Sequence, residues 1–215
     1  MKNKISEVYK LLFDAFGEQH WWPSDSPLET CIGAILTQNT AWTNVEKAIV
    51  NLKKERLINI KALHEIEEDK LAQLIRPSGY FNIKAKRLKS FITFIHENHQ
   101  GSLDRFFAED NVRGKLLEVK GVGPETADSI LLYAGNIPTF VIDAYTRRIF
   151  SRLGICSEDT SYGELRKIFM ESLPEDYKIY NEYHALIVRH AKEHCRKKPI
   201  CAGCPLVKMC EYACG

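Results

Sequence analysis

The sequence has almost no net charge, modest amounts of glycine and proline, and no long apolar segment. Its 215 residues carry 30 Lys and Arg against 28 Asp and Glu, and a charge of +2 alone does not indicate a nucleic-acid-binding protein. With 45% hydrophobic residues, 12 Gly and 8 Pro, the chain is not disordered, collagen-like or a disulfide-dense miniprotein. No apolar run reaches the roughly 18 residues of a membrane span. We therefore expect a soluble protein with one large domain or two small ones.

Two other features are nearly absent. The start at Met1 leads into an amphipathic helix pattern rather than a signal-peptide core. We therefore expect a cytoplasmic protein, nucleoid-associated if it is bacterial or archaeal. Two-residue alternation is also scarce, because Thr139–Ile142 is only a short apolar approach to a helix. The chain has no internal repeat, low-complexity stretch or long linker that would mark a domain boundary.

Apolar residues recur at helical spacing almost throughout, so the predicted fold class is all-α. The first helix, for example, has Ile5, Val8 and Leu12 on one face, and Gly17 ends it. The predicted helices cover residues 4–16, 28–37, 43–53, 60–65, 68–75, 82–97, 102–107, 111–118, 124–134, 143–153, 161–172 and 178–194.

The seven cysteines are unevenly placed, and five of them lie in the last 21 residues. Cys31 and Cys156 stand alone on apolar helix faces and are expected to be buried core residues. Four others have intervals of five, two and five residues and can converge on one metal centre; they are Cys195, Cys201, Cys204 and Cys210. Such compact intervals favour a [4Fe–4S] cluster over zinc, which usually binds two separated C-x2-C pairs. Unmetallated cysteines are the third interpretation, and Cys214 is expected to be a free thiol.

Residues 116–127 read as a helix, a turn with two glycines, and a second helix that Pro124 opens. Glycines in such a turn let backbone amides hold a phosphate oxygen, often with help from a monovalent cation. This is the helix-hairpin-helix pattern for gripping a nucleic-acid backbone, and the alternative is an ordinary tight connection. The DNA-binding residues that we expect here are Gly121, Val122, Gly123 and Thr126.

Asp143 follows Gly123 by 20 residues, at the end of an apolar approach and the start of a helix. An acid at such a point is directed out of a core. It is equally expected to be a helix N-cap, which stabilises a helix by about 1 kcal/mol.

The order of hairpin, aspartate and cysteine cluster resembles the endonuclease III group of helix-hairpin-helix DNA glycosylases. Residues 36–40 (Leu-Thr-Gln-Asn-Thr) resemble the segment whose glutamine, here Gln38, fills the gap left by a flipped base. Residues 79–85 resemble the loop that wedges the opposite strand, with Tyr80 at the wedge position. The resemblance implies two helical lobes. One covers residues 24–132, and the other combines 1–23 with 133–215 and contains the [4Fe–4S] loop.

Two departures from the family pattern refine this expectation. Bifunctional members carry a lysine just after the hairpin glycines, and this chain has Glu125 there. A carboxylate cannot form a Schiff base, and Lys120 is out of register, so we expect a monofunctional enzyme without efficient AP-lyase activity. The first cysteine interval is five residues where the family usually has six.

The chain also resembles the 3-methyladenine DNA glycosylases of this group, some of which lack the cysteine cluster. The resemblance assigns a substrate base pocket to Trp21, Trp22, Pro23, Trp42 and Lys192, although lobe packing and a solvated helix charge are the alternatives. Tryptophan faces bind a cationic ring such as 3-methyladenine, at about 0.5–2 kcal/mol each.

The predicted function is base excision repair of alkylated purines, with Asp143 as the catalytic residue. The expected partner is double-stranded DNA with a damaged base, bound by a monomer and without a membrane. The alternatives are a glycosylase for uracil, mismatched thymine or mismatched adenine, and a non-catalytic DNA-damage-binding module. The basic residues that could meet phosphates, several of which are equally expected to be solvated helix charges, are Arg76, Lys84, Lys86, Arg87, Lys89, Arg196, Lys197 and Lys198.

Overall fold

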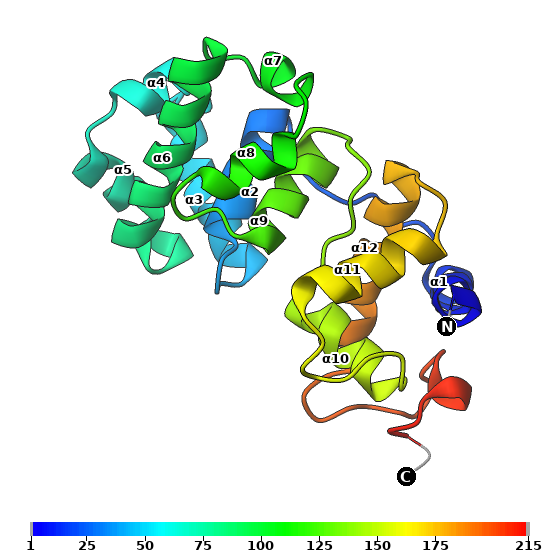
Figure 1. Cartoon of the computed structure of the whole chain (residues 1–215). Coiled ribbons are helices and arrows are strands. Elements are labelled where there is room, and N and C mark those ends of the chain that lie inside the picture. The colour runs from blue at the N-terminus through cyan, green and yellow to red at the C-terminus, as the bar shows by residue number, and fades with distance from the viewer. Residues whose placement is uncertain (1, 214–215) are drawn as a thin grey trace. The chain divides into compact units, whose positions relative to one another are not determined.

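The computed structural model describes residues 2–213 and confirms the all-α fold class (Figure 1). No β-strand occurs among these residues, and the predicted helices are present with ends within two residues of the prediction, except that the helix predicted over 124–134 is α-helical only to Ser129 and π-helical from Ile130 to Ala134. Cys214, which we expected to be a free thiol, lies outside the described residues. None of the described helices is both long and apolar enough to cross a membrane.

The chain folds into two compact units. The hairpin unit is the segment Ser24–Gly135. It contains α2 (Pro27–Leu36), α3 (Trp42–Lys54), α4 (Ile60–Glu65), α5 (Glu68–Leu74), the 3-10 turn η1 (Arg76–Ser78), α6 (Phe81–His99), α7 (Leu103–Phe107), α8 (Val112–Glu118), α9 (Pro124–Ser129) and the π-helical turn η2 (Ile130–Ala134). The terminal unit joins the described residues up to Pro23 to those from Asn136 onward. It contains α1 (Lys2–Phe16), α10 (Ala144–Arg152), α11 (Tyr162–Ser172), α12 (Tyr177–Glu193) and the 3-10 turn η3 (Val207–Met209).

Side-chain caps set several of the helix starts. Ser26 accepts a hydrogen bond from the Glu29 amide of α2, where Pro27 occupies the first turn. Ser161 and Glu164 form a reciprocal capping box at the start of α11. These short polar residues satisfy amides that the helix itself leaves unpaired, which explains why the sequence marks the helix starts well.

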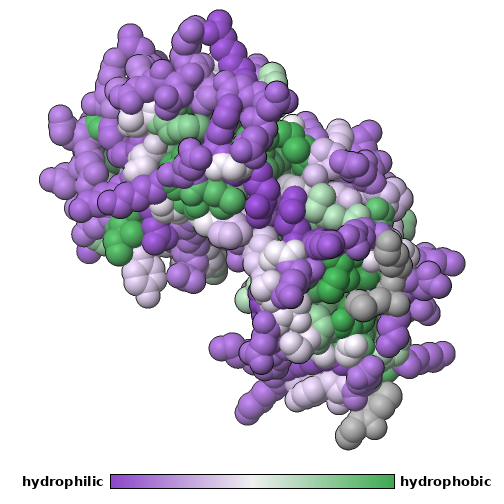
Figure 2. Space-filling view, in the orientation of Figure 1, coloured by the Kyte–Doolittle hydropathy of each residue, from purple (hydrophilic) through white to green (hydrophobic). Residues whose placement is uncertain are grey.

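Helix α2 is the centre of the hairpin unit. All of its residues from Leu28 to Leu36 are buried, and it packs against α3, α6, α9 and η2. Figure 1 shows α2 lying among these helices. The visible surface is mostly hydrophilic, with smaller apolar areas, as expected when the apolar faces of the helices are turned inward (Figure 2).

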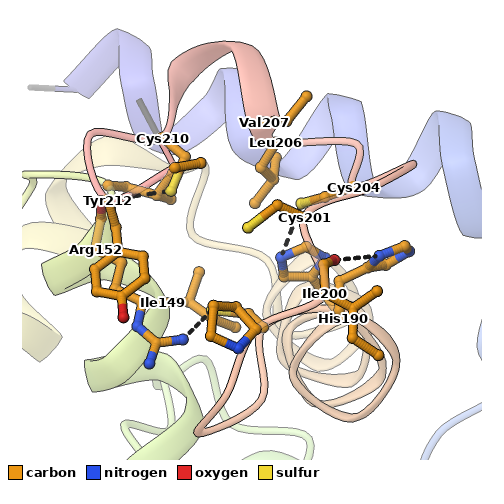
Figure 3. A pocket seen from close by; sticks show the side chains of 15 residues that line it. Ile149, Arg152, His190, Ile200, Cys201, Cys204, Leu206, Val207, Cys210 and Tyr212 are labelled. Carbon is orange, nitrogen blue, oxygen red and sulfur yellow. Dashed lines mark hydrogen bonds between the residues drawn. The ribbon is translucent and has the colours of Figure 1, made fainter. Parts of the chain in front are cut away.

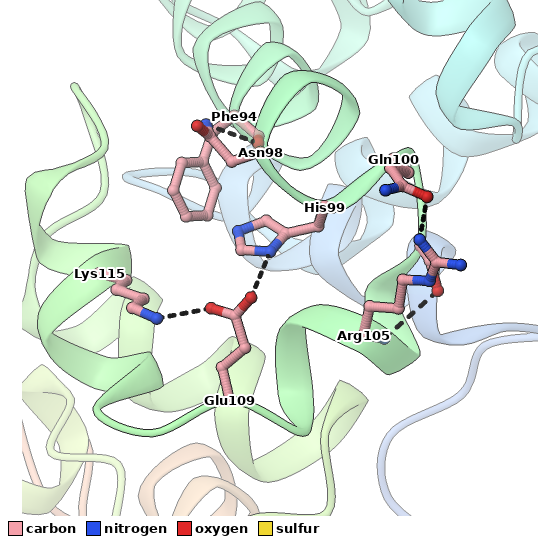
Figure 4. Close-up of polar contacts among 8 residues, drawn as sticks. Phe94, Asn98, His99, Gln100, Arg105, Glu109 and Lys115 are labelled. Carbon is pink, nitrogen blue, oxygen red and sulfur yellow. Dashed lines mark hydrogen bonds and ion pairs between the residues drawn. The ribbon is translucent and has the colours of Figure 1, made fainter.

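Two polar networks hold the second half of the hairpin unit. Asp128 is fully buried, and Arg113 donates to both of its carboxylate oxygens at 2.8 and 3.0 Å, which ties α8 to α9. His99 Nδ1 lies 3.0 Å from Glu109 Oε1, and Lys115 Nζ lies 2.5 Å from Glu109 Oε2 (Figure 4). The second network joins the end of α6 to the segment that enters α8.

Aromatic rings fill the core of the terminal unit. The Phe169 ring stacks 4.1 Å from that of Phe140 and lies 4.6 Å from that of Phe150. The Tyr183 hydroxyl of α12 donates to the Ile5 carbonyl of α1 at 2.8 Å. These contacts explain how the first helix belongs with helices that follow it by more than a hundred residues.

Three expectations about single residues are wrong. Lys84 is only 1% exposed, and its amine donates to the Leu36 and Ser78 carbonyls rather than facing solvent. The amine of Lys89 donates to three carbonyls at the end of α4. Cys31 is buried on α2 as predicted, but Cys156 is only half-buried, in the turn after α10 rather than on a helix face.

Candidate functional site

The hairpin is a tight turn between α8 and α9. Gly121 has a φ of +91°, and a Cβ atom there would lie 2.2 Å from Cγ of Arg87. Gly123 is exposed, has extended backbone, and has open space where a Cβ would lie. The side chains of Val122 and Thr126 are buried, and the Val122 amide donates to the Val119 carbonyl at 3.0 Å, so a DNA contact from Thr126 requires its backbone amide.

The side chain of Gln38 is bound to this hairpin. Its Nε2 donates to the Gly121 carbonyl at 3.1 Å and to Thr126 Oγ1 at 2.9 Å. Its Oε1 accepts a hydrogen bond from Arg87 Nη1. The residue expected to fill the gap in DNA is therefore held, in this structure, by both its amide nitrogen and its oxygen.

Tyr80 stands at the start of α6, where the backbone changes direction. It has left-handed backbone dihedrals, with a φ of 46°, and follows Gly79 with a φ of 67°. Its side chain is 70% exposed, and Ile83, one turn later, is 52% exposed. An exposed tyrosine in an unfavourable backbone conformation has no packing role, and left-handed residues of this kind are often functional.

Asp143 is the N-cap of α10, so the capping interpretation is confirmed. Its Oδ1 accepts hydrogen bonds from the Thr146 amide at 2.7 Å and from the Thr146 hydroxyl at 2.9 Å. The second carboxylate oxygen, Oδ2, lies 3.6 Å from Nε2 of His184 on α12. The cap occupies one oxygen and leaves the other directed at the histidine.

The surroundings of Asp143 favour its ionised form. Burial raises the pKa of this carboxyl, but the nearby His184 imidazole and the two hydrogen bonds from Thr146 outweigh burial and hold the pKa below its ordinary value. The side chains of Asp143 and His184 are only 15% and 7% exposed, so water screens this pair weakly. His184 was not predicted from the sequence, because a single histidine among buried helix residues is not distinguishable from a core residue.

The predicted base-pocket residues are divided between the two units. Trp21, Trp22 and Pro23 belong to the terminal unit, and the two indole rings pack edge to face at 5.7 Å. Glu182 of α12 accepts a hydrogen bond from the Gln19 amide at 2.8 Å, which anchors the start of this loop. In the hairpin unit, the Nε1 of Trp42 donates to Glu46 at 2.9 Å.

The three charged residues expected near the base pocket and the hairpin are exposed. Lys192 is exposed on the last turn of α12, and Glu125 is exposed on the first turn of α9. Lys120 is also exposed and precedes both hairpin glycines. A carboxylate therefore stands at the position where the resemblance places the lysine of bifunctional relatives.

The four predicted cluster cysteines line one pocket of the terminal unit (Figure 3). Between the lining side chains, the space that a water-sized molecule can occupy is about 30 Å³. No three His, Cys, Asp or Glu side chains of residues 2–213 converge as ligands of a single ion. The cysteines are free thiols, among which Cys195 is buried and the other three are half-buried.

The negative charge that the four cysteine thiolates would carry in this pocket favours a positively charged metal centre. Burial raises the pKa of the Cys204 thiol, and the charges of neighbouring thiolates raise it further. Thiolates this close need a positive centre to remain ionised together. Arg152 Nη1 lies 3.3 Å from Cys195 Sγ, and His190 Nε2 lies 3.9 Å from Cys204 Sγ. The chemistry of the four thiol donors therefore fits an iron–sulfur cluster.

Comparisons with known proteins agree with this geometry. The HhH-GPD family, described as a superfamily of base excision DNA repair proteins, matches residues 32–175. A Methanocaldococcus jannaschii protein with the provisional name DNA repair glycosylase is 51% identical over 210 residues, which are 96% of this chain and 95% of that protein.

Two solved structures are also similar. An H. pylori 3-methyladenine DNA glycosylase bound to 1,N6-ethenoadenine aligns with a TM-score of 0.80 and 33% identity, over 88% of this chain and 97% of that one. A trapped covalent complex of endonuclease III with DNA aligns with a TM-score of 0.87 and 23% identity, over 99% of this chain and 97% of that one. At this identity the similarity shows the fold alone. The chain therefore belongs to the HhH-GPD superfamily of base excision DNA repair proteins, in the endonuclease III group of helix-hairpin-helix DNA glycosylases.

Proposed function

We propose that this protein is a monofunctional DNA glycosylase that hydrolyses the N-glycosidic bond of alkylated purines such as 3-methyladenine. The observation that carries the proposal is the Asp143 carboxylate, which is shielded from water, capped through one oxygen and directed at His184 through the other. An ionised carboxylate is what a positively charged, oxocarbenium-like sugar requires in its transition state.

DNA binding is proposed for the hairpin unit. The backbone amides of Gly121 and Gly123 hold phosphate oxygens, while Gln38 fills the duplex and Tyr80 wedges it. The exposure of Tyr80 and the open space at Gly123 support these roles. A monovalent cation at this turn is part of the proposal, since the carbonyls of Val119 and Gly121 each accept one hydrogen bond and keep a second lone pair. The partner is duplex DNA with a damaged base, bound by a monomer.

The chemical step is hydrolysis with the damaged base flipped out of the helix. The bond between the anomeric carbon and the purine nitrogen breaks, and the base leaves with its electron pair. Water adds to the anomeric carbon, and its proton passes to Asp143, which orients the water. The products are the free base and an abasic site.

The absence of lyase activity is proposed from Glu125. Strand cleavage through a Schiff base needs an amine at the sugar, and a carboxylate cannot supply one. The exposed position of Glu125 at the start of α9 supports this assignment, because α9 directly follows the hairpin turn.

The choice of alkylated purines follows from the tryptophans and from one relative. A cationic purine is attracted to indole faces, and Trp21, Trp22 and Trp42 would supply them together with Pro23. The H. pylori protein with 33% identity is a 3-methyladenine DNA glycosylase. Lys192 is proposed as a further contact at the edge of the base pocket.

A [4Fe–4S] cluster is the proposed cofactor, held by Cys195, Cys201, Cys204 and Cys210. When bound, the cluster cross-links the C-terminal loop through four thiolate bonds. Arg152 secures the same loop, since it donates to the Arg196 carbonyl at 2.7 Å and accepts at its own carbonyl from the Tyr212 amide at 3.2 Å.

A lesion panel tests the function. Duplex oligonucleotides that carry an alkylated purine, uracil, a mismatched thymine or a mismatched adenine are incubated with the protein, and abasic sites are scored. We expect abasic sites mainly in the alkylated duplex. Binding to damaged DNA without abasic sites in any duplex would instead indicate the non-catalytic module.

A further inference from the structure

Lys84 is buried between two segments that carry the proposed DNA-inserting residues. Its side chain is 1% exposed, although it lies in the first turn of a helix whose neighbouring residues Asn82 and Ile83 are exposed. The Nζ atom donates to the Leu36 carbonyl at 2.7 Å and to the Ser78 carbonyl at 2.6 Å. Both bonds lie within the hairpin unit.

Each of the two carbonyls belongs to the last residue of a helical element. Leu36 is the last residue of α2, and Gln38 follows it by two residues. Ser78 is the last residue of η1, and Tyr80 follows it by two residues. The Lys84 amine therefore links the backbones of the two turns. In each turn, the carbonyl that it binds lies two residues before the proposed DNA-inserting side chain.

Burying this amine is unfavourable by itself. Burial lowers the pKa of Lys84 to about 8, with a further contribution from the charge of Arg87. An apolar side chain of similar length would fill the same space without that cost, but it could not bond to either carbonyl. Only the two hydrogen bonds offset the free-energy cost of burying the amine. A lysine differs from an apolar side chain at this position because it links the two turns through these bonds.

We propose that Lys84 is a positioning residue that fixes the spacing of Gln38 and Tyr80, so that both side chains enter the duplex together. The proposal rests on the proposed roles of these two residues in DNA binding. Lys84 itself does not contact DNA, because it is buried. It acts through the backbone of the turns on either side of it.

The same helix provides a matched control. Lys89 of α6 donates to the carbonyls of Leu63, His64 and Ile66 at 3.1, 2.6 and 2.8 Å. These carbonyls lie at the end of α4, away from residues 36–40 and 78–80 in the sequence. Lys89→Met removes lysine–carbonyl bonds from the same helix without touching the proposed DNA-inserting turns.

The test uses a duplex with a tetrahydrofuran abasic analogue beside 2-aminopurine, whose fluorescence rises when the base unstacks. Because this duplex contains no base to excise, the result does not depend on the lesion that the enzyme prefers. Wild type, Lys84→Met, Lys89→Met and the double variant Gln38→Ala/Tyr80→Ala are compared for fluorescence and duplex affinity. Circular dichroism and thermal unfolding establish that each variant is folded at the assay temperature.

We expect Lys84→Met to slow the fluorescence rise roughly 10-fold or more, and Lys89→Met to leave it unchanged. Lys84→Met should weaken binding in the wild-type background and have no further effect on affinity in the double variant. If Lys84→Met fails to fold, Lys84→Gln, which keeps two N–H donors on a shorter chain, is measured instead and should give a smaller reduction.

Three results would overturn the inference. An unchanged fluorescence rise in the folded Lys84 variant would contradict it, provided that Gln38→Ala/Tyr80→Ala abolishes the rise. Equal losses of affinity in both backgrounds would indicate general destabilisation rather than positioning. If the double variant itself behaves as wild type, the proposed roles of Gln38 and Tyr80 fail, and the inference fails with them.

Discussion

Asp143 Oδ2 and His184 Nε2 lie 3.6 Å apart, while the other oxygen of Asp143 caps α10. One carboxylate therefore caps a helix and also faces a histidine. The cap fixes the side-chain rotamer, and the histidine stabilises the charge. A carboxylate oriented in advance and kept ionised is suited to stabilise positive charge on a sugar.

Asp143→Asn is expected to reduce base release by roughly 10²–10³-fold or more, because the neutral amide cannot stabilise the positively charged sugar. Affinity for undamaged duplex should stay within about 2-fold, since phosphate contacts are assigned to the other unit. Single-turnover excision and a gel-shift titration measure the two effects.

Asp176→Asn is the matched control. Asp176 caps α12 in the same unit and accepts from the Lys178 amide at 2.8 Å. If it lowered base release as much as Asp143→Asn, the effect of Asp143 would be loss of a cap rather than chemistry.

His184→Gln should move the acid limb of the excision rate to higher pH. Without the imidazole, burial dominates and the pKa of Asp143 rises, so the ionised fraction falls at a higher pH than in wild type. We expect a shift of about one pH unit, measured under single turnover with spontaneous depurination subtracted. Identical acid limbs for both proteins would show that His184 does not set the charge of Asp143.

Gly121→Ala should destabilise the protein by about 1–3 kcal/mol, because the left-handed backbone is strained with a side chain and the added Cβ meets Arg87. Gly123→Ala, which has ordinary φ and open space, should change stability by only about 0.5 kcal/mol. Chemical denaturation measures both. Equal effects would contradict the described turn geometry.

Glu125→Lys should give at most a small gain of strand cleavage, since a lysine at this position still needs a refitted site around it. Borohydride trapping of a protein–DNA adduct measures the gain. Wild type should give no adduct with a damaged duplex. An adduct formed by the wild-type protein would contradict the monofunctional assignment.

Cys204→Ala should remove the iron and the visible absorption at roughly 400 nm, because three thiolates hold a [4Fe–4S] cluster less firmly than four. Cys31→Ala, at a buried position on α2, should keep both. Iron and sulfide analysis of the purified proteins measures the result. A colourless wild-type protein that contains zinc would refute the cluster.

The helices could be predicted from sequence because local signals specify them. Ser26, Ser161 and Asp143 cap helices as their residue types suggest, and the apolar spacing identifies the buried faces. The hairpin turn was also visible, since Gly121 adopts the positive φ that its residue type allows.

Contacts between distant segments were not predictable. Lys84 and Lys89 have the spacing of solvated helix charges, yet both bond to backbone carbonyls of other elements. His184 meets Asp143 across 41 residues, a pairing that no local pattern encodes. The sequence identified the chemical groups of the site but not the residues that hold them in place.

Release of free 3-methyladenine from methylated duplex DNA, with the wild-type protein and Asp143→Asn side by side, tests the central claim most directly. The account predicts that wild type releases the base and leaves intact abasic strands, while Asp143→Asn binds the duplex and releases almost none. Equal release by both proteins, or no release by wild type, would contradict it.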